Sequence, residues 1–308
     1  MRVVFMGTPD FSVPALENIA KRYEVVAVVT QQDRPKGRGH KMQYTPVKEK
    51  AIELEIPVYQ PKRVKDPEFV DILKTLKPDV IVVIAFGQIL SKEILEIPKY
   101  GCINVHASLL PKYRGAAPIQ WAVINGDKKS GVTTMYMAEG LDTGDIIDTS
   151  EIVLDEKETG GSLFDKLADL GGKLILNTLD KLETGTATRT RQDDARSTYA
   201  GKITKELGKI DFTKSAAEIE RLIRGLNPWP SAFTYMDDKM LKIWNADVLE
   251  ETVEEDPGTI TEVNKKFIKV ATGEGYLLLK EIQLEGKKRM NVTSFLNGYN
   301  FTANKLGN

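Results

Sequence analysis

The sequence is poor in side chains that bind metals or form covalent cross-links. It contains one cysteine, Cys102, and two histidines, His40 and His106. A single cysteine excludes an internal disulfide bond and a cysteine metal cluster. The apolar neighbours Ile103 and Val105 indicate that Cys102 is a buried structural thiol. We therefore expect neither a disulfide nor a bound metal in this protein.

Long apolar runs are also missing. The first apolar stretch, Val3 to Met6, is interrupted at once by Gly7-Thr8-Pro9-Asp10 and is far too short for a signal peptide. No segment approaches the roughly 20 apolar residues that a membrane helix requires. We expect a soluble, cytoplasmic protein without a membrane anchor.

The chain has no excess of charge of either sign. Its 43 Lys and Arg residues face 44 Asp and Glu residues, which gives a net charge of −1. An anionic partner must therefore be held by a local basic patch. A length of 308 residues favours two domains, because one ordinary core does not grow to that size. We expect the protein to be a monomer.

The first domain, expected over residues 1–185, alternates apolar strands with helical patterns. Residues 80–85 are apolar at every position, as expected for a central strand covered on both faces. The pattern predicts a doubly wound, mainly parallel, Rossmann-like sheet. The expected strands are 3–6, 25–29, 80–85, 132–137 and 146–153. The expected helices are 11–23, 46–54, 67–76 and a helix opened by Ser162, with Asp165 three residues on, that runs to Leu182.

A polar stretch and a second domain follow. Residues 183–197 contain almost no apolar side chains, so we assign 186–204 to an interdomain linker. In residues 205–308, Ser215 and Glu218 predict a capping box at the start of a helix that stops at Asn227-Pro228. Five short strands then predict a small antiparallel β-barrel of the oligonucleotide-binding (OB-like) kind.

The most informative stretch places an amide, an imidazole and a hydroxyl at alternate positions, Asn104, His106 and Ser108. Residues two apart in a strand share a face, so these side chains can point toward one pocket while Val105 points into the core. Ligands of doubly wound folds bind beyond the carboxyl ends of the strands. We therefore expect the site at this end of the sheet.

A carboxylate completes the arrangement. Asp142 and Asp145 lie in a glycine-bounded loop between two predicted strands. An amide and an imidazole can stabilise a developing oxyanion, and a carboxylate can orient the imidazole or a water molecule. Such a trio suits direct acyl transfer to an amine. From spacing alone, hydrogen-bonded structural polar groups and simple turn formation explain these residues equally well.

Residues 104–115 follow the pattern Asn-x-His-x-Ser-Leu-Leu-Pro-x-Tyr-Arg-Gly, and Leu-Asp-Thr-Gly stands at 141–144. These motifs resemble the 10-formyltetrahydrofolate-dependent formyltransferases. Residues 5–11, 30–39 and 227–230 are similar to the members of that family that formylate an aminoacylated tRNA. Gln32 departs from the proline expected there in many members.

The resemblance implies the roles of particular residues. Asn104, His106 and Asp142 would be catalytic, with no metal. The formyl donor would be 10-formyltetrahydrofolate, the acceptor the α-amino group of methionyl initiator tRNA, and the product tetrahydrofolate, for translation initiation. The implied folate-binding residues are Ser108, Leu109, Leu110, Pro111, Phe86, Gly87, Gln88, Ile89 and Leu90.

A basic stretch over residues 34–50 is the candidate contact for RNA, with Arg34, Lys36, Arg38 and Lys41 as its first members. A run of charge is usually a solvated face. Its place beside the predicted active-site edge instead favours contacts to the phosphates of an acceptor stem.

Several other functions remain open. The turn at Gly7 lacks the second and third glycines of a dinucleotide-binding loop, which disfavours a hydride-transfer enzyme. A formyltransferase acting on a small amine, such as an amino-sugar nucleotide or glycinamide ribonucleotide, would use the same trio but would not explain the basic loop and second domain. A noncatalytic RNA-binding protein would leave the trio unexplained. A folate hydrolase fused to a further catalytic domain would need more chain than is present.

Overall fold

A computed structural model describes residues 1–36 and 41–307 of the chain. The described residues form two compact units. The first unit comprises Met1–Pro118, Lys129–Val153 and Phe164–Ala200, and the second comprises Ile119–Lys128, Leu154–Leu163 and Gly201–Asn308.

These units differ from the expected domain boundaries at three short segments. Residues 119–128 and 154–163 group with the second unit. There the Arg224 guanidinium donates a 2.7 Å hydrogen bond to the carbonyl of Glu158, and the amide of Gly161 donates a 2.9 Å bond to the carbonyl of Asn227. Residues 186–200, assigned to a linker from their polar composition, belong to the first unit.

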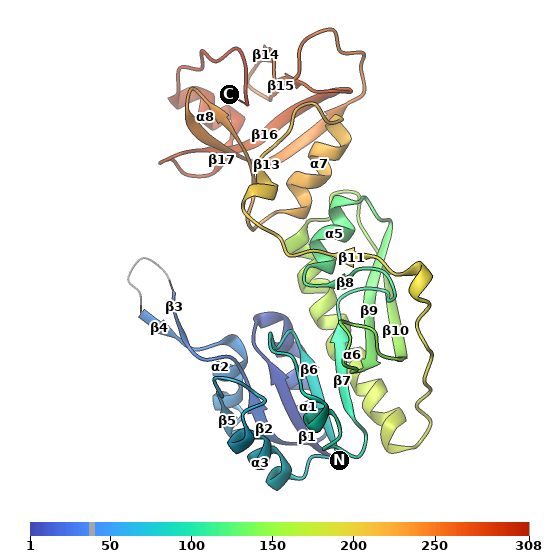
Figure 1. The fold of residues 1–308 in the computed structure, drawn as a ribbon. Coiled ribbons are helices and arrows are strands. Elements are labelled where there is room, and N and C mark those ends of the chain that lie inside the picture. The colour runs from blue at the N-terminus through green and yellow to red at the C-terminus, as the bar shows by residue number, and fades with distance from the viewer. Residues whose placement is uncertain (37–40, 308) are drawn as a thin grey trace. The chain divides into compact units, whose positions relative to one another are not determined.

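The first unit is built on a seven-stranded sheet with the order β10-β9-β7-β6-β1-β2-β5 (Figure 1). Strands β2, β1, β6 and β7 are parallel neighbours, whereas β9 runs antiparallel to β7 and β10 antiparallel to β9. The predicted doubly wound, mainly parallel sheet is confirmed. The strands are β1 (Arg2–Gly7), β2 (Glu24–Val29), β5 (Val58–Tyr59), β6 (Val80–Ile84), β7 (Cys102–His106), β9 (Lys129–Tyr136) and β10 (Ile146–Val153).

Helices cover both faces of this sheet. Phe69 and Leu73 of one helix share a core with Met6 and Val83 of the sheet. On the other face, Gly171 lies against Val105. Both faces of the sheet are therefore shielded from solvent, which explains why β6 is buried at every position. The helices are η1 (Asp10–Ser12), α1 (Val13–Ala20), α2 (Pro46–Glu53), α3 (Pro67–Leu76), α4 (Lys92–Leu95) and α6 (Gly160–Glu183), the last spanning residues of both units.

Helix α6 begins three residues earlier than its sequence predicts. The side chain of Thr159 accepts a 3.0 Å hydrogen bond from the amide of Ser162, and the Ser162 hydroxyl accepts a 2.9 Å bond from the amide of Thr159. Ser162 is therefore the fourth residue of a capping box and not its first. The prediction was wrong because Thr159 and Ser162 are both able to cap.

The second unit is a six-stranded antiparallel sheet with the order β12-β13-β16-β15-β14, in which β17 also pairs with β16 (Figure 1). The antiparallel pairing predicted for this domain is confirmed; β12 and β14 stand at the two ends of the strand order, and closure into an OB-like barrel stays a prediction. The predicted capping box of Ser215 and Glu218 is also confirmed, and it opens the helix whose Ile219 and Ile223 enter the core. The strands are β12 (Ala232–Met236), β13 (Lys239–Leu249), β14 (Ile260–Val263), β15 (Ile268–Ala271), β16 (Tyr276–Leu284) and β17 (Met290–Asn291). The helices are α5 (Pro118–Ile124), η3 (Glu206–Gly208), α7 (Ala216–Gly225) and α8 (Val292–Gly298).

Several short elements were not predicted. They are too brief to show a hydrophobic period, and the pair β8 and β11 also joins segments that are distant in sequence. In the first unit they include the hairpin of β3 (Arg34–Lys36) and β4 (Lys41–Gln43), the parallel pair β8 (Arg114–Gly115) and β11 (Tyr199–Ala200), and η2 (Asp194–Arg196). Across the described ranges, no helix is both long and apolar enough to cross a bilayer.

Cys102 provides a test of this packing. Its side chain is 2% exposed, and burial raises the pKa of the thiol to about 12. The thiolate is the reactive form of cysteine, and below that pKa the thiol keeps its proton. We expect no reaction with a chromogenic disulfide reagent at pH 8 in the native protein, and one equivalent after unfolding in guanidinium chloride. Rapid stoichiometric labelling of the native protein would contradict this placement.

Candidate active site

The candidate site begins at the carboxyl ends of the neighbouring strands β7, β6 and β1. Thr8, directly after β1, donates a 3.0 Å hydrogen bond from its hydroxyl to the carbonyl of Phe86, directly beyond β6. The side-chain amide of Gln31 donates a 3.1 Å bond to the same carbonyl. The turn after β1 therefore fixes the loop that follows β6.

Within that loop, the residues expected to hold the pterin have different environments. Phe86 and Leu90 are buried, and Gly87 adopts a positive φ of 84°. The carboxamide of Gln88 accepts a 2.7 Å hydrogen bond from the amide of Val64, so it anchors the neighbouring segment. Ile89 is 85% exposed. Its side chain is the one that this loop presents outward.

His106 ends strand β7 and is almost fully buried. Its Nε2 lies 2.9 Å from the carbonyl oxygen of Tyr113. Because a carbonyl oxygen only accepts, Nε2 carries the hydrogen of this bond. The other ring nitrogen, Nδ1, lies 3.8 Å from Oδ2 of Asp142. Two fixed neighbours therefore set the orientation of the ring.

Asn104 lies two residues before His106 in the same strand, so the two side chains share one face of the sheet. It is half-buried, between the buried Ile103 and Val105. Among the described residues, none hydrogen-bonds to its carboxamide. Within that part of the chain, the two N–H donors of this amide have no competing acceptor.

Asp142 approaches from the loop between β9 and β10. Since β9 is antiparallel to β7, its carboxyl end lies beside the start of β7, where Tyr136 pairs with Ile103. The loop must fold back to bring Asp142 to His106. Asp142 adopts a φ of 52°, a conformation that aspartate tolerates better than most residues, and its Oδ2 accepts a 2.8 Å hydrogen bond from the amide of Gly115.

The structure does not place Ser108 on the expected common face. Strand β7 ends at His106, and the Ser108 hydroxyl donates a 2.7 Å hydrogen bond to the carbonyl of Lys112. Thr133 accepts from the amide of Leu110 and donates to the carbonyl of Ser108. Leu110 is buried, whereas Leu109 and Pro111 are half-buried. Ser108 therefore shapes the loop from within.

The sequence did not reveal one residue that supports the candidate site. Gln192, in the presumed linker, donates from its side-chain amide to the carbonyls of Asp142 and Gly144, at 2.8 and 2.7 Å. Its side-chain oxygen accepts two hydrogen bonds from Arg114. A single glutamine in a polar stretch has no periodic signal that distinguishes it from solvent-facing neighbours.

The basic stretch divides into a hairpin and a paired region. Arg34 on β3 is exposed, and β3 pairs with β4 so that Lys36 stands opposite Lys41. Lys48 instead makes a 2.5 Å ion pair with Asp33. Partial burial raises the pKa of Asp33, but hydrogen bonds from Lys48 and Gln60 outweigh it and hold the pKa below its ordinary value. Arg38 lies outside the described residues.

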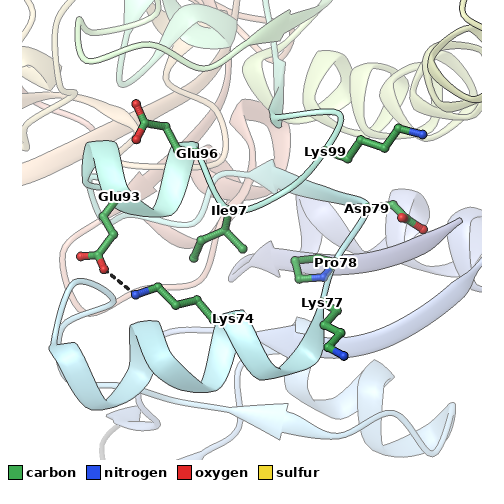
Figure 2. Close-up of a pocket in the computed structure, with 8 residues that line it drawn as sticks. All are labelled: Lys74, Lys77, Pro78, Asp79, Glu93, Glu96, Ile97 and Lys99. Carbon is green, nitrogen blue, oxygen red and sulfur yellow. Dashed lines mark hydrogen bonds and ion pairs between the residues drawn. The ribbon is translucent and has the colours of Figure 1, made fainter.

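A surface pocket elsewhere in the first unit is separate from these residues (Figure 2). It lies where β6 begins, because Pro78 and Asp79 of its lining directly precede that strand. Lys74 and Glu93 of the lining are ion-paired at 2.7 Å. Binding in doubly wound sheets occurs at the opposite strand ends. The pocket therefore offers no alternative centre for the chemistry.

Two family models match the chain. The one described as formyl transferase matches residues 1–179, and the one described as formyl transferase, C-terminal domain, matches residues 202–300. The chain belongs to the formyl transferase family. The resemblance found in the motifs at 104–115 and 141–144 is therefore confirmed.

Named relatives in the formyl transferase family match both units. Methionyl-tRNA formyltransferase of Lachnospira eligens is 59% identical over 304 residues, covering 97% of this chain and 96% of the relative. The enzyme of the same name from Clostridioides difficile is 56% identical, covering 97% of each chain. Among solved structures, WlaRD, a sugar 3N-formyl transferase, is 20% identical with a TM-score of 0.69, covering 94% of this chain and 99% of its own. That likeness supports the fold alone.

Gly144 gives a test of how tightly the Asp142 loop is held. A Cβ atom at this position would lie 1.6 Å from the carbonyl oxygen of Tyr136, which belongs to the backbone and cannot rotate away. We expect Gly144→Ala to lower the free energy of unfolding by about 1 to 3 kcal/mol and to speed hydrogen exchange at the amide of Gly115.

The control for this substitution is Gly298→Ala, since a Cβ at Gly298 meets nothing within 4 Å. Denaturant unfolding gives the free energy of unfolding of both variants, and amide hydrogen exchange gives the exchange rate at Gly115. Equal stability and exchange in the two variants would contradict the tight loop.

Proposed function

We propose that this protein transfers the formyl group of 10-formyltetrahydrofolate to the α-amino group of methionyl initiator tRNA, a step of translation initiation. The observation that carries this proposal is the similarity to methionyl-tRNA formyltransferases at 59% and 56% identity over nearly the full length of both chains. The similarity at this level of identity extends over the second unit as well as the first.

The pairing of His106 with Asp142 supports a direct transfer. The neutral amine attacks the formyl carbon, a new C–N bond forms, and the bond from that carbon to N10 of the folate breaks. Asn104 and His106 stabilise the oxyanion of the tetrahedral intermediate. Asp142 orients His106 or a water that moves the proton from the attacking amine to N10. The carboxamide of Asn104, to which no described residue hydrogen-bonds, suits this role, because its donors need not break a bond within that part of the chain.

The folate is proposed to lie between two loops. Residues 108–111 follow the catalytic strand, and residues 86–90 follow its neighbour β6, so both stand at the carboxyl edge of the sheet. The exposed Ile89 is suited to cover the pterin ring. Ser108, whose hydroxyl is already bonded to Lys112, contributes by shaping the loop.

The acceptor is proposed to meet the hairpin of β3 and β4. Arg34, Lys36 and Lys41 supply cations there, and Lys48 and Lys50 are neutralised by carboxylates of the same unit. Phosphate contacts of this kind position a nucleic acid without reading its sequence. We expect a monomer that acts in the cytoplasm, where initiator tRNA is used.

Substitutions in the trio test the mechanism. Asn104→Ala removes a donor to the oxyanion, and His106→Ala removes the imidazole proposed to stabilise it, so kcat for formylation of methionyl-tRNA should fall by about 10² to 10³ in each variant. Single-turnover assays with 10-formyltetrahydrofolate measure the loss, and thermal melts check that each variant is folded. Near-normal turnover in both variants would remove these residues from the mechanism.

The same assay separates the alternative functions. The purified protein is incubated with the formyl donor and either methionyl-tRNA or a panel of amino-sugar nucleotides and glycinamide ribonucleotide. We expect formylation of methionyl-tRNA alone. Formylation of a small amine would identify the enzyme rival, and RNA binding without any formylation would identify a noncatalytic RNA-binding protein.

Salt dependence tests the hairpin. Each phosphate contact adds about one to the slope of log K against log salt concentration. We expect Arg34→Ala combined with Lys41→Ala to weaken tRNA binding and to reduce that slope by about 2. Lys50→Ala is the matched control, because Lys50 is ion-paired with Glu17 and Glu53 at 2.8 and 2.6 Å. An unchanged slope in the double variant would contradict phosphate binding by the hairpin.

A further inference from the structure

Segment 190–200 connects two loops of the candidate active site. Its amide and carbonyl at Thr190 both hydrogen-bond to Ile146, where β10 begins. Its far end pairs with β8, with Tyr199 opposite Arg114 and Ala200 opposite Gly115. The segment therefore runs from the start of β10 to the stretch that donates to the carboxylate of Asp142.

Gln192 is the point at which this segment meets the Asp142 loop. We propose that Gln192 is a positioning residue for formyl transfer, which holds Asp142 at its place beside His106; this inference rests on the proposed function. Arg114 is the second positioning residue, since it fixes Gln192.

The hydrogen bonds of Gln192 specify an amide at this position. Its nitrogen donates to the carbonyls of Asp142 and Gly144, and its oxygen accepts from Nε and Nη2 of Arg114 at 3.0 and 2.8 Å. Both donors and both acceptor sites are used. A glutamate would set a carboxylate oxygen against two carbonyl oxygens, while keeping the contact to Arg114.

Burial strengthens the hydrogen bonds of Gln192. Every residue from Glu183 to Tyr199 is described, and Gln192 is the only buried one, at 6% exposure. The Arg114 side chain is 12% exposed and also reaches Asp194 at 2.8 Å. Hydrogen bonds shielded from water are stronger, and an unpaired buried partner is costly. The loop therefore has one strongly preferred position.

The contacts form a closed ring around Asp142. Gln192 binds its backbone carbonyl, while Gly115, the neighbour of Arg114, binds its carboxylate at 2.8 Å. The backbone of Asp142 is held by β8 through Gln192 and Arg114. Its carboxylate is held by the same strand through Gly115. Displacement of the loop would move the carboxylate away from His106, and a misplacement of about 1 Å can cost about 10²-fold in rate.

The test compares Gln192→Glu with wild type in the full-length protein. Because the carboxylate still pairs with Arg114, we expect the fold to be retained, with a melting temperature lowered by the two carbonyls that lose their donor. We expect kcat for formylation of methionyl-tRNA to fall by about 10- to 100-fold, while KM for either substrate changes less than about threefold. The pH profile of kcat should also shift, because the carboxylate beside His106 moves.

Hydrogen exchange provides a readout that does not depend on activity. Exchange at the amide of Gly115 and across residues 140–145 should be faster in Gln192→Glu. A wild-type protein that fails to formylate methionyl-tRNA would refute the proposed function, while this exchange measurement would still test the positioning role.

Two further variants keep the result interpretable. Arg114→Lys retains the charge but removes the two-point contact to Gln192, so it should reproduce the fall in kcat even if Gln192→Glu folds poorly. Gln283→Glu makes the same change at a half-buried glutamine of the second unit that donates to the carbonyl of Lys287, and should leave kcat unchanged. Wild-type kcat and exchange in Gln192→Glu, or a rise in KM with kcat unchanged, would overturn the inference.

Discussion

Asp142 accepts a hydrogen bond from the backbone amide of Gly115, and this contact joins two loops that follow different strands. The same carboxylate lies 3.8 Å from Nδ1 of His106. Much of the local architecture serves to keep these three groups together: Tyr113 fixes the imidazole, and Gln192 fixes the backbone of Asp142. The site depends on loop positions that no single strand determines.

The scaffold beneath is of a different kind. His106 and Asn104 belong to a strand in a sheet covered on both faces, where packing leaves little freedom. Asp142 and Gln192 come from irregular segments whose positions depend on polar contacts. Catalytic sites commonly combine a rigid strand with loops in this way. Here the rigid part carries the proposed oxyanion donors, and the loops carry the carboxylate.

The fold was accessible from the sequence where burial imposes a pattern. The apolar run at 80–85 indicated a central parallel strand, and Ser215 with Glu218 indicated the start of α7. Predictions failed where several polar residues can play one part, as at Thr159 and Ser162. For the candidate site, Asn104, His106 and Asp142 were found from spacing and motif, and their catalytic role stays a proposal. Ser108 was misjudged because the strand ends at His106.

The role of Gln192 could not be predicted from the sequence, for another reason. A polar stretch without period predicts exposure, and its single buried amide becomes visible only once the distant carbonyls of Asp142 and Gly144 are placed beside it. Contacts between segments far apart in sequence carry no local pattern. The same holds for Arg114, which was part of a recognised motif but had no assigned role.

The pairing of β11 with β8 also bears on how such proteins are recombined. Segment 190–200 has the composition of a spacer, yet its last two residues are in register with Arg114 and Gly115. An engineer who joins the first unit to a foreign partner should cut after Ala200 and carry the whole segment along. Replacement by a glycine-serine tether would leave the sheet intact and still dismantle the support of Asp142.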